Sequence, residues 1–368
     1  MHTLGTAIII FTLFLASFVS TFGSSIVVGD ETTIAAHFRV SSDSTSSLVA
    51  TYLFGCALAP LVFSPLSERH GRRFAIWGGT GIMAIFNMAS AAAPNWAALL
   101  AFRFFAGFGS SAAMVVPSGI IADILPNVHL RGLASSWMMV NTTLGSVFGS
   151  IVSTAVHARW PGLWNVAYWI NGGASVLAFA LLLALPETRK KTIGEKHESP
   201  IKLSRVEQLI LPIRMLLLEP MVTFCCLFLS TIYGIYYLLF QLLPPAFTTV
   251  YGWEGKTNDV TFVPLAVGTV LAGIVFTASS PALCRWAEGE GRARWAPENR
   301  RLPLACIGAG FIILALFVLG YAVREGTSSS LALVAEGAFG LGFLLVFMSL
   351  TNYLVDAYKV RSPASKSS

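Results

Sequence analysis

A short charged segment is the first part of the sequence that could do chemistry. Gly71 permits a tight reversal of the chain, and Arg69, Arg72 and Arg73 form a cationic cluster beside the carboxylate of Glu68. A carboxylate among guanidinium groups stays ionised and accepts charge-assisted, often bidentate hydrogen bonds. The segment can therefore latch neighbouring helix ends together. The alternative is that its arginines only set the orientation of membrane spans.

Two further ionisable residues lie inside apolar stretches, Arg103 and Glu336. A charge within a membrane span is costly enough to mark a functional residue by default. A guanidinium does not titrate, so proton exchange near Arg103 also needs a carboxylate. Glu336 lies about two turns inside its helix if that helix begins near Ser329. Buried there, it can exchange protons near neutral pH. The alternatives are that Arg103 pairs structurally with a carbonyl or carboxylate group, and that Glu336 reaches water from the helix end.

Two more carboxylates, Asp30 and Glu31, follow the first apolar stretch. Because they come just after the end of a predicted span, we expect both side chains to be solvated. They leave no obvious buried carboxylate in the first half of the chain.

The composition excludes an ordinary soluble globule. The 368 residues are 55% hydrophobic and 11% charged, and the mean hydropathy is +0.70, whereas soluble proteins carry about 25% charged residues. The formal charge of +6 does not indicate nucleic-acid binding, because the basic residues lie in short loops between apolar stretches. The five cysteines have no metal-ligand or CxxC spacing. The chain is predicted to be an all-α polytopic membrane protein that uses no metal or cofactor.

With about 20 apolar residues needed for each span, the sequence contains ten candidates. They lie near residues 5–28, 45–66, 74–93, 97–122, 133–156, 163–185, 217–245, 260–280, 303–322 and 330–355. With the N-terminus in the cytoplasm, most of the 24 lysines and arginines fall on the cytoplasmic side. This asymmetry supports both the segmentation and the orientation.

A polar interval divides the ten spans into six and four. The predicted organisation is an N-terminal six-helix bundle at 1–186, a cytoplasmic linker at 187–216, a four-helix C-terminal bundle at 217–357 and a polar tail at 358–368.

The charged segment also has a recognisable spacing. Pro65-Leu66-Ser67-Glu68, two residues, then Gly71-Arg72-Arg73 resembles the loop between helices 2 and 3 of the major facilitator superfamily, in the form seen in fungal multidrug:proton antiporters. The resemblance continues in the same order along nearly the whole chain. Further matching segments begin at Phe18, Arg103, Ile121, Arg131, Pro186, Tyr251, Pro297 and Tyr353.

The resemblance implies a twelve-helix transporter with two six-helix bundles and a substrate site near the midplane between them. Here the second bundle has four predicted helices, since helices 11 and 12 would follow Tyr358. We therefore expect a C-terminally truncated form.

The resemblance also assigns roles to particular residues. The arginine that matches Arg103 faces the central cavity and takes part in proton coupling, which leaves Glu336 as the candidate carboxylate. A network of residues at the cytoplasmic helix ends steadies one state of the transport cycle. Its members here are Glu68, Arg69, Gly71, Arg72, Arg73, Asp123, Arg131, Glu187 and Arg189.

Helix 5 carries Gly145 and Gly149, and two glycines four residues apart let a neighbouring helix approach closely. Family antiporters have a proline after each glycine, but here Ser146 and Ser150 stand in those places. The kink that the prolines provide is therefore not expected, and the direction of transport stays open.

Polar and aromatic residues inside the spans are candidates for the wall of the substrate cavity. They are Asn87, Asn141, Asn171, Tyr233, Tyr237 and Gln241. An apolar cavity with a few hydrogen-bonding groups suits amphipathic organic molecules. The alternative for each residue is a hydrogen bond that only joins two helices.

The resemblance implies proton-coupled efflux of drugs, toxins, secondary metabolites or polyamines, by a monomer in the plasma membrane or alternatively in the vacuole. The expected partners are a small organic substrate, protons and the lipid bilayer, and not nucleic acid. Two alternatives remain, a transport-inactive membrane protein and a facilitator that imports. The six histidines are scattered, and no nucleophile–base spacing or phosphate-binding loop suggests an enzyme.

Overall fold

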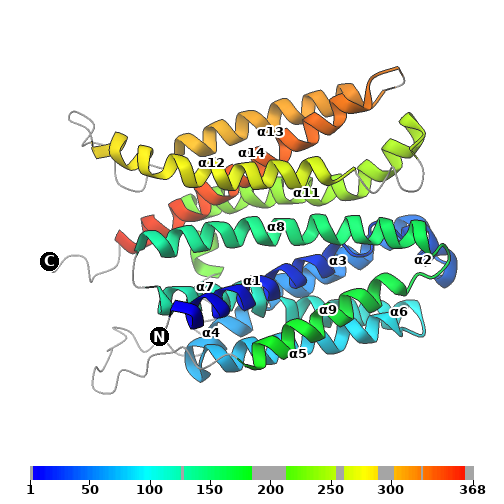
Figure 1. The fold of residues 1–368 in the computed structure, drawn as a ribbon, viewed down its shortest axis with the longest axis horizontal. Coiled ribbons are helices and arrows are strands. Elements are labelled where there is room, and N and C mark those ends of the chain that lie inside the picture. Colours follow the sequence, from blue (N-terminus) through cyan, green and yellow to red (C-terminus); the bar gives the residue numbers. More distant parts are fainter. Residues whose placement is uncertain are drawn as a thin grey trace. The chain divides into compact units, whose positions relative to one another are not determined.

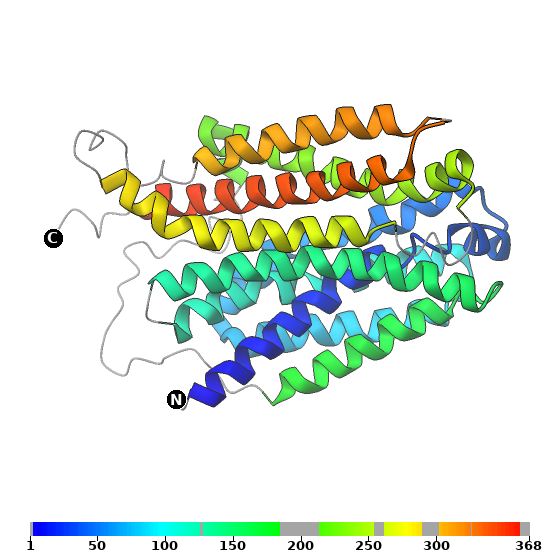
Figure 2. The ribbon, with the colours of Figure 1, turned by 45° about the horizontal axis from the view of Figure 1, so that its top comes forward.

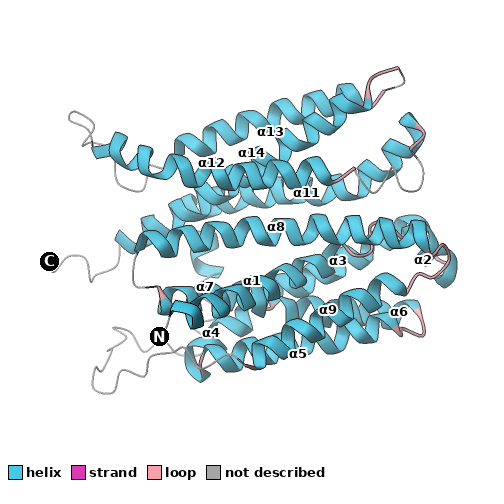
Figure 3. Cartoon of the chain, viewed as in Figure 1, coloured by secondary structure: helices cyan, strands magenta, loops and turns pink. Residues whose placement is uncertain are grey.

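The computed structural model describes residues 3–125, 128–184, 213–253, 261–288, 302–324 and 326–360, and every regular element in these ranges is a helix (Figure 3). The chain divides into two compact units, which we describe separately (Figure 1).

The first unit contains nine helices among the described residues. They are α1 (Thr3–Ser25), α2 (Glu31–Phe38), α3 (Ser42–Leu58), α4 (Pro60–His70), α5 (Arg72–Ala91), α6 (Trp96–Ser110), α7 (Ala112–Ile124), α8 (Val128–Arg159) and α9 (Val166–Leu183). The labelled helices of the second unit are α11 (Pro220–Tyr251), α12 (Val263–Glu288), α13 (Leu302–Ala322) and α14 (Ser329–Val360).

The predicted spans agree with the helices. Among the described residues nine helical segments are long and apolar enough to cross a membrane, and Val263–Ser279 is a shorter apolar helix. Together they fall on the ten predicted stretches within a few residues, so the prediction of an all-α polytopic membrane protein is confirmed. Hydropathy predicts such spans well because backbone groups inside a bilayer must be paired within the segment, which favours helices.

Two of the spans are broken in the middle. The second span consists of α3 and α4, which meet at Ala59, and Pro60 begins α4. Proline has no N–H to continue the hydrogen bonds of the preceding helix, so a break at this point is expected. The fourth span consists of α6 and α7, which meet at Ser111.

Helix α2 was not predicted. It is eight residues long and buries Ile34 and Ala35. Asp30, directly before it, is its N-cap residue. At its other end Arg39 adopts a left-handed conformation with φ 55° and ends the helix. Its eight residues are far fewer than the roughly 20 that cross a bilayer, so hydropathy does not predict it.

In the first unit α5 packs against α6 and α9, α3 packs against α6, and α1 packs against α8. The contact between α1 and α8 is close because α8 presents glycines to α1. A Cβ atom added at Gly145 would clash with the carbonyl oxygen of Phe18, and one added at Gly149 would clash with that of Phe22. We call this contact the α1–α8 seam.

In the second unit α14 packs against both α12 and α13 (Figure 2). Glycines again permit the approach. A Cβ atom at Gly268 of α12 would meet the carbonyl oxygen of Gly337, and one at Gly342 of α14 would meet that of Gly308 on α13. Small residues at such crossings allow backbones to approach closely in membrane bundles.

The predicted domain boundaries stay predictions. Residues 185–212 and 361–368 lie outside the described residues, and they include most of the predicted linker and tail. The described part of the linker, residues 213–216, is helical.

The α1–α8 seam makes a prediction about stability. Gly149→Ala places a methyl group against the backbone of α1, so we expect thermal unfolding of the purified full chain to occur several degrees lower. Gly132→Ala is the matched control on the same helix, because a Cβ atom at Gly132 meets nothing within 4 Å. That variant should be as stable as the original chain or slightly more so, since alanine favours helix by about 1 kcal/mol over glycine. Equal stability of the two variants would contradict the close packing.

Candidate functional site

Arg103 lies in the interior of the first unit with its side chain fully buried. Its Nη1 donates to the carbonyl oxygen of Gly23 at 2.7 Å, and its Nη2 donates to that of Ser24 at 3.1 Å. Its Nε donates to the carbonyl oxygen of Leu48 on α3 at 3.3 Å. Because α1 ends at Ser25, the guanidinium caps two of the carbonyl groups that the end of a helix leaves unpaired.

Aromatic rings complete the surroundings of Arg103. Its guanidinium carbon lies 4.4 Å from the ring centroid of Tyr52 and 5.9 Å from that of Tyr168. The Tyr52 hydroxyl donates to the carbonyl oxygen of Ser20 at 2.6 Å. A planar cation over aromatic faces is stabilised by the ring quadrupoles, which reduces the cost of burying the charge. No carboxylate among the described residues pairs with Arg103.

The three asparagine candidates of the first unit have different surroundings. Asn141 Nδ2 donates to the carbonyl oxygen of Phe14 at 2.8 Å and so joins α8 to α1. Asn87 Nδ2 donates to Ser175 Oγ at 2.8 Å and joins α5 to α9. Asn171 is fully buried, and neither atom of its amide has a hydrogen-bond partner among the described residues. Asn87 Oδ1 is also buried without a partner among the described residues, so Asn171 has two such atoms and Asn87 has one.

The charged segment forms part of the predicted network. Arg72 Nε lies 3.4 Å from Asp123 Oδ2, and its Nη1 donates to Ser67 Oγ at 2.9 Å. These contacts join α5 to α7 and α4. Gly71 has φ 101°, a conformation that favours glycine, at the turn between α4 and α5.

The other members of the network lie elsewhere. The guanidinium carbon of Arg73 lies 4.0 Å from the ring centroid of Trp77, and Arg73 makes no ion pair with a carboxylate that the structure describes. Arg69 is exposed, and Arg131 makes no ion pair with any residue that the structure describes. Glu187 and Arg189 lie outside the described residues, as does the side chain of Glu68. Their roles stay predictions.

Helix α8 is continuous from Val128 to Arg159. Without the two prolines of the antiporter pattern, Ser150 Oγ donates to the carbonyl oxygen of Ser146 at 3.2 Å and leaves the helix unbroken. The absence of the kink stays a prediction, because α11 is equally continuous with two prolines inside it.

In the second unit Glu336 is fully buried, and neither carboxyl oxygen has a hydrogen-bond partner among the described residues. Helix α14 begins at Ser329, as expected. The alternative that the Glu336 carboxylate reaches water is therefore wrong, because the surrounding helices cover it.

The aromatic candidates of the second unit form one cluster between α11 and α14. Tyr233 and Tyr237 lie 5.1 Å apart between ring centroids, and Tyr233 also packs 6.3 Å from Phe343. Phe343 follows Glu336 by seven residues, so the two lie on the same face of α14. Gln241 is half-buried, one turn beyond Tyr237 on α11.

The expectation that Asp30 is solvated is wrong. Its side chain is 3% exposed and lies 2.8 Å from His157 Nδ1, measured from Oδ1. The two residues are 127 positions apart, one just before α2 and the other in α8, so no local pattern in the sequence indicates the pair. The sequence contains one indirect signal of this site. Helix α1 has no charged residue from Thr3 to Ser25, and two carboxylates, Asp30 and Glu31, follow within six residues.

Glu31 is also more buried than expected. Burial raises the pKa of its carboxyl to about 7, and a hydrogen bond with Thr45 opposes the rise. One carboxyl oxygen, Oε1, is buried without a partner among the described residues. Glu31 therefore holds a proton well above the pH at which an exposed glutamate loses it.

These features define a polytopic helical membrane protein with buried ionisable groups in both units. Residues 13–365 match the family model of the Major Facilitator Superfamily. The chain therefore belongs to this superfamily, whose members are secondary transporters rather than enzymes.

Relatives and solved structures agree with this assignment. The chain is 31% identical over 362 residues to the MFS-type transporter acdC of Aspergillus candidus, covering 92% of this chain and 70% of that protein. It is 28% identical to Polyamine transporter 3 of Saccharomyces cerevisiae and 28% identical to the MFS-type efflux pump MFS2 of Trichophyton rubrum, with 92% of this chain covered in each comparison.

The fold is similar to that of the proton:xylose symporter XylE, with a TM-score of 0.69 and 17% identity over 96% of this chain and 82% of that one. The chain spans 56% of Polyamine transporter 3 and 60% of the efflux pump MFS2.

The contacts of Arg103 predict that it is needed for stability. Arg103→Met leaves the carbonyl groups of Gly23 and Ser24 at the end of α1 without their donors, whereas Leu48 keeps its bond within α3. Each unpaired buried group costs about 1–3 kcal/mol. We expect a marked loss of thermal stability in the purified chain, and only partial recovery in Arg103→Lys because an ammonium lacks the planar fork. Arg131→Gln is the control and should unfold like the original chain. If Arg103→Met unfolds like the original chain too, then Arg103 does not cap α1.

The raised pKa of Glu31 predicts a pH dependence. The stability that its protonated carboxyl contributes is complete below about pH 4.5 and is lost as the pH rises through about 7. Glu31→Gln mimics the protonated form, so the variant should unfold at the same temperature as the original chain at pH 4.5 and about 2–4 °C higher at pH 8. Asp43→Asn, which changes an exposed carboxylate on α3, should show no such difference. A Glu31→Gln variant whose unfolding follows the original chain at both pH values would refute this account.

Proposed function

We propose that this chain is a secondary active transporter that exports small organic compounds in exchange for protons, by alternating access. The observation that carries the proposal is Glu336. A carboxyl group that is fully buried and has no described partner is poorly stabilised as an anion. It can bind a proton and release it when a change of conformation opens it to water.

The relatives support the substrate class. Proteins similar to this chain over 92% of its length carry the names polyamine transporter and efflux pump. We therefore propose drugs, toxins, secondary metabolites or polyamines as substrates, exported by a monomer in the plasma membrane with the N-terminus and the charged segment in the cytoplasm. Under this orientation α2 lies on the outer side.

In this proposal Arg103 is the fixed positive charge of the first unit. Because it does not titrate, it does not carry the proton itself. It holds the end of α1 and keeps Tyr52 and Tyr168 around a buried cation. The Arg72–Asp123 contact fixes the cytoplasmic ends of α5 and α7 in the state described here.

Two alternatives are kept. Helix α8 has Ser146 and Ser150 in the places of the two prolines of the antiporter pattern, which favours a facilitator that imports. The other alternative is a membrane protein that does not transport.

The test is accumulation of a panel of toxic or fluorescent amphipathic compounds and polyamines in a pump-deficient yeast that expresses the 368-residue chain. We expect several-fold lower accumulation, which a protonophore abolishes because the proton gradient is the driving force. Glu336→Gln should abolish export, because an amide cannot carry a proton. Asp43→Asn is the matched carboxylate control and should export normally.

Each result has a distinct meaning. Unchanged accumulation with a well-expressed chain contradicts export, and raised accumulation supports import. Normal export by Glu336→Gln removes Glu336 from the mechanism while export itself stands.

A further inference from the structure

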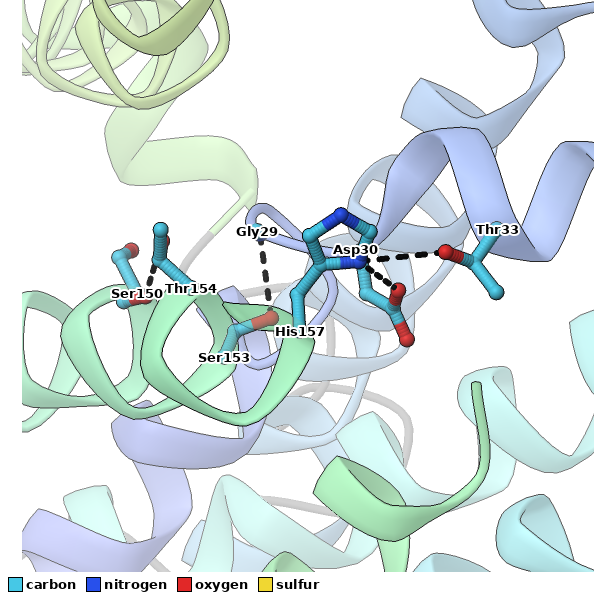
Figure 4. Close-up of polar contacts among 7 residues, drawn as sticks. All are labelled: Gly29, Asp30, Thr33, Ser150, Ser153, Thr154 and His157. Carbon is cyan, nitrogen blue, oxygen red and sulfur yellow. Dashed lines mark hydrogen bonds and ion pairs between the residues drawn. The ribbon is translucent and has the colours of Figure 1, made fainter. Parts of the chain in front are cut away.

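The pair formed by Asp30 and His157 joins two segments of the first unit at the end where α2 lies (Figure 4). Asp30 Oδ1 and His157 Nδ1 are 2.8 Å apart, and Thr33 Oγ1 lies 3.2 Å from the same nitrogen. The Asp30 side chain is 3% exposed, whereas the His157 side chain is 36% exposed. The pair thus combines a sealed carboxylate with an imidazole that water can reach.

Asp30 does not perform its usual local task. It is the N-cap residue of α2, where an aspartate normally accepts a hydrogen bond from an amide of the first turn, but its side chain makes no such bond. It turns to His157 instead. His157 lies in the last turn of α8. A helix N-terminus stabilises a carboxylate and a helix C-terminus stabilises a cation, so both helix ends favour the charged form of the pair.

The pair also closes the α1–α8 seam. On α8, Gly145, Gly149, Ser153 and His157 follow at intervals of four residues and therefore share one face. The two glycines meet α1, and Ser153 Oγ accepts a hydrogen bond from the amide of Gly29 at 3.1 Å. His157 continues this line to Asp30. A change at His157 therefore acts on the end of a tightly packed helix contact.

Chemistry fixes which ring nitrogen takes up the proton. An ionised carboxylate only accepts hydrogen bonds, so Nδ1 of His157 must carry a hydrogen and donate it to Asp30. The free nitrogen is Nε2, which points away from Asp30 (Figure 4). A proton added at Nε2 breaks no bond and turns the existing hydrogen bond into a charge-assisted one, which is about twice as strong.

We propose that Asp30 and His157 form a second proton-binding site, in the first unit, where a proton taken up at His157 Nε2 fastens the α1–α2 junction to α8. Loss of the proton weakens this contact. Histidine suits such a site because its ordinary titration range lies near physiological pH. That the site serves transport rests on the proposed function, whereas proton binding itself does not.

Other titratable or charged groups on the elements around the pair must be separated from it. They include Glu31 and His37 of α2, Arg39 at the end of α2, Asp43 and Tyr52 of α3, Arg103 of α6, Arg159 of α8 and Tyr168 of α9. Helix α1 contributes none. Tyr168 is within electrostatic range of both Asp30 and Arg103. Glu31 is the main competitor, because its stability contribution is lost over the same range of pH as the proposed site.

A double-mutant cycle separates the pair from its neighbours. The purified full chain, Asp30→Asn, His157→Gln and the double variant are unfolded by heat at pH 5.5 and at pH 8.0, each in a Glu31→Gln background. We expect the interaction between the two substitutions to be about 2–4 °C larger at pH 5.5, because only the protonated imidazole forms an ion pair. His70→Gln changes an exposed histidine on α4 and should show no interaction with Asp30→Asn.

The same interaction at both pH values would overturn the proposal, since the pair would then be a structural hydrogen bond without proton binding. If Asp30→Asn does not fold, His157→Gln alone must lose more stability at pH 5.5 than at pH 8.0, and equal losses overturn the proposal equally. The cycle needs no transport. If the interaction is larger at pH 5.5 but the chain exports nothing, the proton site stands and the proposed function is refuted. If the chain exports but the interaction is the same at both pH values, only the proton site is refuted.

Discussion

Burial of the Arg103 guanidinium is the constraint on which the first unit depends. A charge without water must be compensated by hydrogen bonds and polarisable groups, and here these are three carbonyl oxygens and two tyrosine rings. Two of the carbonyls belong to the last turn of α1, so the arginine also marks where that helix ends. Since the chain can turn at that point, Asp30 is brought to the end of α8, and α2 forms beyond it.

Close packing of small residues is the second constraint. The glycines of α8 have no side chain, so the backbones of α8 and α1 come into direct contact. Glycines of α12, α13 and α14 allow the same contact in the second unit. Such contacts fit in one arrangement and do not deform gradually, so a helix either packs or separates. Transport by alternating access needs contacts of this kind, and a proton held near one of them can bias the choice.

The parts that the sequence predicted and the parts that it missed differ in physical origin. The spans were predictable because bilayer thickness and backbone pairing impose length and composition on each segment separately. Arg72 and Asp123, which are in contact, were placed in one network only through the family resemblance. In contrast, the Asp30–His157 pair and the carbonyl ligands of Arg103 depend on how distant helices cross, which no local pattern records. Helix α2 was missed because eight residues are too few to show an apolar period.

The central claim is that proton movement and substrate movement are coupled in this chain. The most direct measurement uses the purified 368-residue chain in proteoliposomes that contain a pH-sensitive dye, with a pH gradient imposed across the membrane. The account predicts that adding an amphipathic amine or polyamine substrate dissipates the gradient faster, and that the effect is absent in liposomes without protein. A gradient that decays at the same rate with and without every compound of the panel, in vesicles shown to contain folded protein, would contradict it.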